Sequence, residues 1–334
     1  MTNRREIEMK CKKHAVPGMI LCLLFFCCLM ACSQPEEPIR IGISTWAGVE
    51  PAELAARKGF FKKRGVDVEM VRFSAYKDSI EAFREAKVDA DMQTFDDAIR
   101  LYAAGRKMKI VLFTDYSFGG DGIVARKGID TVGDLKGKKV GVEIGTVGHF
   151  SLLKALDTAG LKEEDISIVS IPAWEIKGAF VAGKIDAGVT WEPYLTSAAK
   201  DGDGRVIITS RDYPKTIVTT MAMSDDMIAR RPDDVQKVVA AYFDAVKYME
   251  AHPGEAYAIM AQAEGESVEE FAGHVEGIRY IDLEANRAAF GTARDGELFD
   301  VGRNLAAFLF EKSMIKTIPD IVGLMDGRFV NNLR

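Results

Sequence analysis

The segment KIDAGVTWEP (184–193) places a Trp and a Glu directly after a short run of small and apolar residues. An earlier segment follows the same plan. AFREAKVDADMQT (82–94) and AFVAGKIDAGVTW (179–191) share Ala, Phe, Lys, Asp and Ala at equivalent positions. In each copy a helical pattern passes through a short polar turn into a strand. We expect two lobes built on one plan, with the strand ends at Thr94 and Trp191 facing each other. The alternative is that the similarity arose by chance between two units of similar composition.

Strand-like and helix-like segments alternate from residue 39 to residue 224. The first series includes the strand patterns IRIGIS (39–44) and KMKIVLFTDYS (107–117), and the second follows the Gly-rich stretch FGGDG (118–122). This alternation is typical of an α/β fold, so we expect a mostly parallel sheet flanked by helices in each lobe. From Asp225 onward apolar residues recur at helical spacing. We expect this helical C-terminal tail to pack on the first lobe.

The N-terminal segment has the pattern of an export signal. Basic residues dominate positions 1–18, and the apolar run MILCLLFFCCLMAC (19–32) follows, too short for a comfortable membrane span. Its end, LMAC, resembles a bacterial lipoprotein signal in which Cys32 is lipidated after cleavage. An ordinary signal peptide that happens to contain Cys is the alternative. We expect a signal peptide over 1–31, a lipidated tether over 32–38, and a protein anchored at the outer face of the cytoplasmic membrane or in the periplasm, with the outer membrane as a further location.

Charge and residue usage argue against several function classes. The chain carries a net charge of −6 and has no dense basic stretch outside its N-terminus, so a nucleic-acid partner has no electrostatic support. His149, His252 and His274 do not stand in a metal-ligand spacing, and neither a G-x-S-x-G nor a Walker A motif occurs. We therefore expect no enzyme activity, no catalytic residue, no metal and no cofactor.

Ligands of open α/β sheets bind beyond the carboxyl ends of the strands. The positions that follow the expected strands are rich in aromatic residues and carboxylates, and they include all three Trp of the chain. The candidate ligand-binding residues are Thr45, Trp46, Thr94, Asp96, Asp97, Asp115, Tyr116, Asp121, Thr146, His149, Trp174, Trp191, Glu192 and Tyr194. Simpler roles stay open for some of them: Asp96 and Asp97 as first-turn acids of a helix, Trp174 as cover for a lobe edge, and GTVGHF (145–150) as an ordinary helix start.

These motifs resemble those of the periplasmic substrate-binding proteins of ABC transporters, in the group that binds nitrate, taurine, aliphatic sulfonates and thiamine precursors. Residues 44–69, 93–105, 115–150 and 179–195 carry the resemblance, which extends over nearly all of residues 39–334. It implies a two-lobed periplasmic-binding-protein type II fold with the ligand between the lobes. It also implies an ABC permease with its ATPase as partner, and we expect a monomer. The family contains a eukaryotic pyrimidine-precursor synthase as well, but the Cys-rich motif of that enzyme is absent here.

The expected lobe boundaries follow from the crossover strands of such a fold. Lobe 1 takes residues 39–124 and 219–334, and lobe 2 takes residues 125–218.

The charges at the strand ends suggest the class of ligand. Five candidates are carboxylates and no Lys or Arg stands at a strand end, so a free oxyanion would meet net repulsion. We expect a small nitrogen-containing solute, cationic or zwitterionic, such as an amine, a guanidine or a urea-like compound. A sulfonate, taurine, nitrate or thiamine-pyrimidine precursor is the alternative, and an exported enzyme on the same fold is a lesser one.

Overall fold

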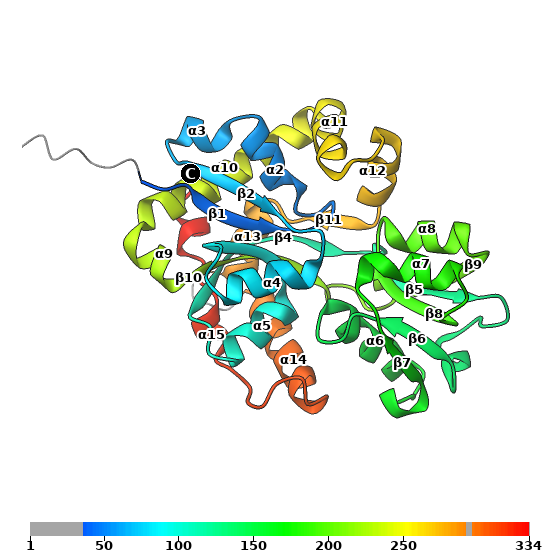
Figure 1. Ribbon diagram of the computed structural model, residues 1–334. Coiled ribbons are helices and arrows are strands. Elements are labelled where there is room, and N and C mark those ends of the chain that lie inside the picture. The colour runs from blue at the N-terminus through cyan, green and yellow to red at the C-terminus, as the bar shows by residue number, and fades with distance from the viewer. Residues whose placement is uncertain (1–35, 292–295, 334) are drawn as a thin grey trace, which may run out of the picture. The chain divides into compact units, whose positions relative to one another are not determined.

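The computed structural model describes residues 36–291 and 296–333. The expected signal peptide and Cys32 lie outside these residues. Residues 38–334 form one compact unit, within which two separate sheets are each flanked by helices (Figure 1). The predicted α/β class with two lobes is therefore confirmed.

The first sheet has six strands in the order β11-β4-β10-β3-β1-β2. The Ile, Ala and Met residues of its central strands are buried, as expected for strands covered on both faces. The strands are β1 (Ile39–Ile43), β2 (Val68–Arg72), β3 (Ala90–Thr94), β4 (Met108–Ser117), β10 (Val218–Ser224) and β11 (Ile278–Tyr280).

The second sheet has five strands in the order β7-β6-β8-β5-β9. It has small apolar cores of its own on its two faces, built around residues such as Leu152 and Phe180. The strands are β5 (Asp121–Arg126), β6 (Lys139–Val142), β7 (Ser167–Ser170), β8 (Ala187–Trp191) and β9 (Gly204–Thr209).

Helices cover both sheets. In the first lobe they are α2 (Glu50–Arg57), α3 (Phe60–Arg64), α4 (Tyr76–Arg84) and α5 (Phe95–Ala103), and in the second α6 (Val147–Thr158), α7 (Ile176–Val181) and α8 (Tyr194–Asp201). Short 3-10 turns lie at Val132–Leu135, Glu163–Asp165, Ala173–Glu175 and Ser210–Asp212. Pro51 stands in the first turn of α2, where its missing N–H costs nothing.

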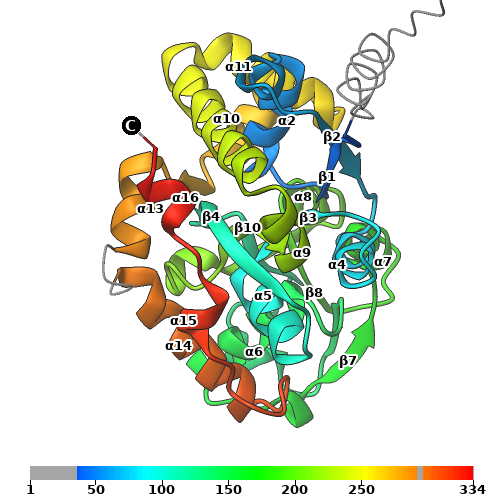
Figure 2. The same ribbon diagram turned by 90° about the vertical axis from the view of Figure 1, so that its left-hand side faces the viewer.

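The C-terminal tail packs on the first lobe, as predicted. Helices α10 and α11 lie against α2, and α14 lies against α5 (Figure 2). The tail comprises α9 (Asp225–Arg230), α10 (Pro232–Ala251), α11 (Pro253–Glu264), α12 (Val268–Val275), α13 (Leu283–Phe290), α14 (Glu297–Glu311), α15 (Ile321–Leu324) and α16 (Arg328–Asn331). None of the helices in the described residues is long and apolar enough to cross a membrane.

Strand pairing is more mixed than the expected mostly parallel sheets. In the first sheet β1 pairs in parallel with β2 and β3, whereas all three antiparallel pairs involve β4 or β10. In the second sheet both antiparallel pairs involve β5. The reason is topological. β5 and β10 enter their lobes from the side where the parallel strands end, so they run in the opposite direction. One strand, β11, lies in the tail that the sequence predicts to be helical. Its three residues are too few to show a strand pattern.

The sheet membership of β5 and β10 bears on the lobe boundaries. β5 belongs wholly to the second sheet and β10 wholly to the first. We therefore propose residues 118–120 as the first crossover, slightly before the expected boundary after residue 124, and residues 213–217 as the second. Main-chain N–H groups of Phe118 and Gly120 donate to the Gly277 carbonyl at 2.8 and 3.1 Å, so the first crossover is tied to the segment before β11.

Candidate functional site

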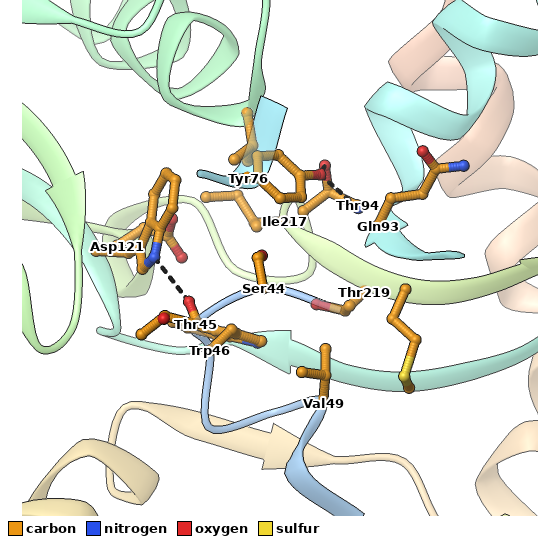
Figure 3. A pocket seen from close by; sticks show the side chains of 13 residues that line it. Ser44, Thr45, Trp46, Val49, Tyr76, Gln93, Thr94, Asp121, Ile217 and Thr219 are labelled. Atoms are coloured by element: carbon orange, nitrogen blue, oxygen red, sulfur yellow. Dashed lines mark hydrogen bonds between the residues drawn. The ribbon is translucent and has the colours of Figure 1, made fainter. Parts of the chain in front are cut away.

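A small cavity lies where strands of both lobes end (Figure 3). Its volume is about 30 Å³, two to three times the minimum that holds one water molecule. The lining residues are Ser44, Thr45, Trp46, Val49, Tyr76, Met92, Gln93, Thr94, Asp121, Val147, Trp191, Ile217 and Thr219.

Five of the sequence-predicted residues line this cavity: Thr45, Trp46, Thr94, Asp121 and Trp191. Thr45 and Trp46 follow β1, Thr94 ends β3, Asp121 begins β5 and Trp191 ends β8. Thr94 and Trp191, the strand ends of the two similar segments 82–94 and 179–191, thus lie at one cavity. Each comes from a different lobe.

Trp191 joins the two lobes. Its indole N–H donates to the Thr45 carbonyl at 3.1 Å, and its ring meets the Tyr76 ring edge-on, with centroids 5.7 Å apart. The Tyr194 ring also meets the Trp191 ring edge-on, with centroids 6.4 Å apart. Trp191 is only 6% exposed. It therefore forms part of the interface between the lobes as well as a side of the cavity.

Asp121 is the carboxylate of the cavity lining. The side chain is almost wholly buried, and burial raises its pKa from 3.8 to about 7. Ser117 lowers that pKa by a hydrogen bond, while the nearby carboxylates Asp115, Asp96 and Glu192 raise it further. An added positive charge in the cavity would favour the ionised form of Asp121.

Asp115 lies directly behind Trp46 and not in the lining itself. Its carboxylate accepts hydrogen bonds from the Trp46 indole N–H at 3.0 Å, from the Thr114 hydroxyl at 2.7 Å and from the Thr219 hydroxyl at 3.3 Å. Burial raises its pKa to about 6, although these three donors lower it. Asp115 therefore orients Trp46 and Thr219 toward the cavity and adds negative potential to it.

The start of α5 forms a hydrogen-bonded group beside the cavity. Asp97 accepts from the Tyr76 hydroxyl at 2.8 Å and from the Thr94 hydroxyl at 2.9 Å, and it pairs with Arg100. Arg100 also donates to the Gly145 carbonyl of the second lobe. Neither carboxylate oxygen of the buried Asp96 has a hydrogen-bond partner among the described residues, and burial raises its pKa. Both acids stand in the first turn, where the helix dipole favours negative charge.

Six other candidates do not line the cavity. The Thr146 hydroxyl donates to the Glu143 carbonyl, and His149 faces Glu163 at 3.5 Å, where burial lowers the pKa of the imidazole. Trp174 is 47% exposed, and Tyr116 and Tyr194 lie outside the lining. Glu192 accepts from the main-chain N–H of Thr196 at 3.1 Å and from its hydroxyl, so it serves the first turns of α8.

Sequence reasoning missed several lining residues. None of them is charged, and several are apolar residues for which a core role is the ordinary expectation. They are Ser44, Val49, Tyr76, Met92, Gln93, Val147, Ile217 and Thr219. Ser44 and Thr219 could have been found, because they adjoin a strand end and a crossover. Gln93 gave no signal: its amide is fully buried without a partner among the described residues, and in Figure 3 it points away from Asp121.

The lining offers hydroxyl groups, aromatic faces and one carboxylate. No Lys, Arg or His belongs to the lining within the described part of the chain. Across residues 36–291 and 296–333, no group of three or more His, Cys, Asp or Glu is arranged to hold a metal ion. The arrangement can bind a small polar solute by hydrogen bonds, aromatic contact and one charge.

Proteins of similar sequence include binding proteins. The chain is 28% identical over 229 residues to a Brucella abortus protein named as a binding protein, covering 67% of this chain and 71% of the other. It is 24% identical over 307 residues to the taurine-binding periplasmic protein of Escherichia coli, covering 88% of this chain and 93% of the relative.

Solved structures share the fold. The periplasmic aliphatic sulphonate binding protein SsuA of Escherichia coli superposes with a TM-score of 0.71 at 23% identity, over 86% of this chain and 97% of that one. The desulfurization enzyme DSZB has the same fold at 15% identity, with a TM-score of 0.64 over 89% of this chain and 98% of that one. Residues 48–256 match the NMT1/THI5-like family over more than half of the chain, and this protein therefore belongs to that family.

Proposed function

We propose that this protein is an exported solute-binding protein that captures a small nitrogen-containing solute between its lobes and delivers it to an ABC permease. The solute is an amine, a guanidine or a urea-like compound, cationic or zwitterionic. The single observation that carries the ligand class is Asp121, a buried carboxylate in a cavity whose lining has no cationic side chain. Two relatives are named as binding proteins, and these names support the general role of solute binding.

Electrostatics favour a positive group in the cavity. Asp121 lines it, and Asp115 and Asp96 lie close enough to raise the pKa of Asp121. A bound cation would gain from these carboxylates and from the faces of Trp46 and Trp191, at about 0.5–2 kcal/mol for each cation–π contact. A free anion would meet the same carboxylates without a guanidinium or ammonium group in the lining to offset them.

Taurine or another aminosulfonate is the second candidate, because a relative is named for taurine binding. A zwitterion could place its ammonium group near Asp121 and its anionic end near the hydroxyl groups of Ser44, Thr45 and Thr219 and the start of α6 at Val147. A thiamine-pyrimidine precursor and an exported enzyme on the same fold are further alternatives, and the ligand panel below tests both.

A thermal-shift panel tests the proposal. The panel includes guanidine, urea, small amines, betaine, taurine, alkanesulfonates, nitrate and a pyrimidine precursor. A ligand at 100 times its dissociation constant stabilises the folded state by about 2.7 kcal/mol, which is readily visible. We expect stabilisation by a nitrogen compound that is recovered unchanged. Stabilisation by nitrate or simple sulfonates alone would refute the cationic ligand, and chemical conversion of the bound compound would support the enzyme.

We further propose that Cys32 is lipidated and anchors a monomeric protein outside the cytoplasmic membrane. The support is the LMAC sequence at the end of the apolar run. Two acyl chains are needed for stable anchoring. Metabolic labelling with a palmitate analogue should mark the wild type and Cys28→Ala but not Cys32→Ala. Equal labelling of all three proteins would contradict the anchor at Cys32.

A further inference from the structure

A buried charged cluster lies behind Trp46. The Glu50 side chain at the start of α2 has 0% exposure, the Glu264 side chain at the end of α11 has 3%, and the Arg72 side chain at the end of β2 has 29%. Arg72 donates to Glu50 at 2.7 Å and to Glu264 at 3.2 Å. The same Glu264 oxygen accepts from the main-chain N–H of Trp46 at 3.2 Å. The cluster thus joins three elements and ends on a residue that lines the cavity.

The charges of this cluster do not balance if both acids are ionised. Two buried carboxylates would face one guanidinium, and an unpaired buried charge is costly. Each acid also has one oxygen, Oε2, without a hydrogen-bond donor among the described residues. A single proton held between the two carboxyl groups would satisfy both oxygens and leave one negative charge for Arg72. Burial, followed by the hydrogen bond and charge of Glu264, raises the pKa of Glu50 well above its ordinary value.

Trp46 is held on several sides, and Glu264 supplies the main-chain anchor. The indole N–H donates to Asp115 at 3.0 Å. A Cβ atom at Gly48 would lie 2.3 Å from the indole nitrogen, and one at Gly120 would lie 2.6 Å from the ring. The ring therefore occupies space that two glycines leave open. Trp191 and Tyr280 hold the neighbouring carbonyls of Thr45 and Ala47, so loss of the bond to Glu264 would free the backbone at Trp46 itself, and the ring could then leave this space.

We propose that Glu50 and Glu264 share one proton and that the pair, neutralised by Arg72, positions Trp46 in the wall of the cavity. Glu264 is the positioning residue that touches Trp46, and Glu50 completes its charge and hydrogen bonding. The effect of Trp46 position on ligand binding rests on the proposed function. The shared proton and the positioning of Trp46 do not. Glu53, the remaining acid near Arg72, pairs with Arg57 at 2.7 Å and is not part of the sharing.

Fluorine NMR of the protein labelled with 5-fluorotryptophan tests both parts of the proposal without a ligand. The chain has three Trp, so three resonances are expected, and Trp46→Phe identifies the relevant one. Trp174, exposed and outside the cavity, is the internal control. Failure of the ligand panel would leave this readout intact, so the two proposals can fail separately.

Glutamine variants test the shared proton. Glu50→Gln and Glu264→Gln each supply an NH₂ donor to the remaining carboxylate and keep one negative charge beside Arg72, so each should leave the Trp46 resonance in place. The double variant leaves Arg72 without a carboxylate and should shift or broaden that resonance. If either single variant displaced the Trp46 resonance as far as the double variant does, the proposal of a shared proton would be overturned.

Alanine variants test the positioning and keep the test decisive if the double variant does not fold. Glu264→Ala removes the acceptor for the Trp46 N–H while Glu50 still pairs with Arg72, so the Trp46 resonance should move. Glu50→Ala leaves Glu264 bonded to both Arg72 and the Trp46 N–H, so the resonance should stay. A Trp46 resonance that responds equally to both alanine variants, or to neither, would overturn the positioning role of Glu264.

Discussion

At the scale of single residues, Asp121 makes stability and binding depend on pH in opposite directions. Its pKa rises from 3.8 to about 7 on folding. Between these values the folded state keeps a proton that the unfolded state has lost. The contribution of Asp121 to stability is therefore fully present below pH 3.8 and is lost as the pH rises through 7. Asp121→Asn should flatten this fall, seen as a smaller decrease of the unfolding temperature between pH 4 and pH 7.

Binding of a cation should follow the ionised fraction of Asp121. Because the pKa of Asp121 is about 7, protonation of this carboxylate should weaken binding about tenfold between pH 8 and pH 6. Calorimetric titration with the ligand from the panel can measure this. Asp91→Asn is the matched control. The pKa of Asp91 is also raised to about 7, but Asp91 does not line the cavity. An unchanged pH profile of binding in Asp121→Asn would contradict the assignment.

At the scale of elements, Glu192 lies two residues before helix α8 and bonds to its first turn. Its contacts with the N–H and hydroxyl of Thr196 resemble a side-chain cap, and removal of such a cap costs about 1 kcal/mol. Glu192→Ala should therefore lower the free energy of unfolding without ligand by about that amount, measured in urea. Glu192→Gln should lose less, because its amide oxygen can still accept.

The control for this prediction is Glu175→Ala, since Glu175 precedes α7 without a side-chain cap. A Glu192→Gln variant with unchanged stability and strongly weakened binding would return Glu192 to the ligand site expected from the sequence.

At the scale of the whole unit formed by residues 38–334, contacts remote from the cavity also join the lobes. The Phe308 ring on α14 meets the Phe150 ring on α6 edge-on at 5.5 Å, and Lys312 pairs with Asp157 at 2.7 Å. An aromatic pair contributes about 0.5–1.5 kcal/mol beyond its buried area. Phe308→Ala should shift the equilibrium toward open lobes by about two- to tenfold, with a larger radius of gyration in X-ray scattering and weaker ligand binding.

Phe310→Ala is the matched control, because Phe310 lies on the same helix, is 49% exposed and has no aromatic contact across the lobes among the described residues. Identical scattering profiles for the wild type and Phe308→Ala, with unchanged affinity, would show that this contact does not stabilise the closed arrangement.

Local patterns in the sequence predicted most of the elements and part of the candidate site. The alternation of strand and helix patterns predicted two α/β lobes, and helical periodicity placed the C-terminal tail on the first. Trp46, Thr94 and Trp191 could be predicted as cavity residues because parallel strands end at one edge, where side chains become available to a ligand. Asp121 begins β5, an antiparallel strand that starts at the same edge.

Only the tertiary structure decided which strand-end residues meet. Tyr76, Ser44 and Thr219 reach the cavity through contacts with residues distant in sequence, and Glu192 turns to its own helix instead. The direction of β5 and β10 depends on where the chain crosses between lobes, and the pairing of Glu50 with Glu264 joins residues more than 200 positions apart. Periodicity records which face of an element is buried. It does not record what that face contacts, because packing and hydrogen bonding between distant segments depend on the whole fold.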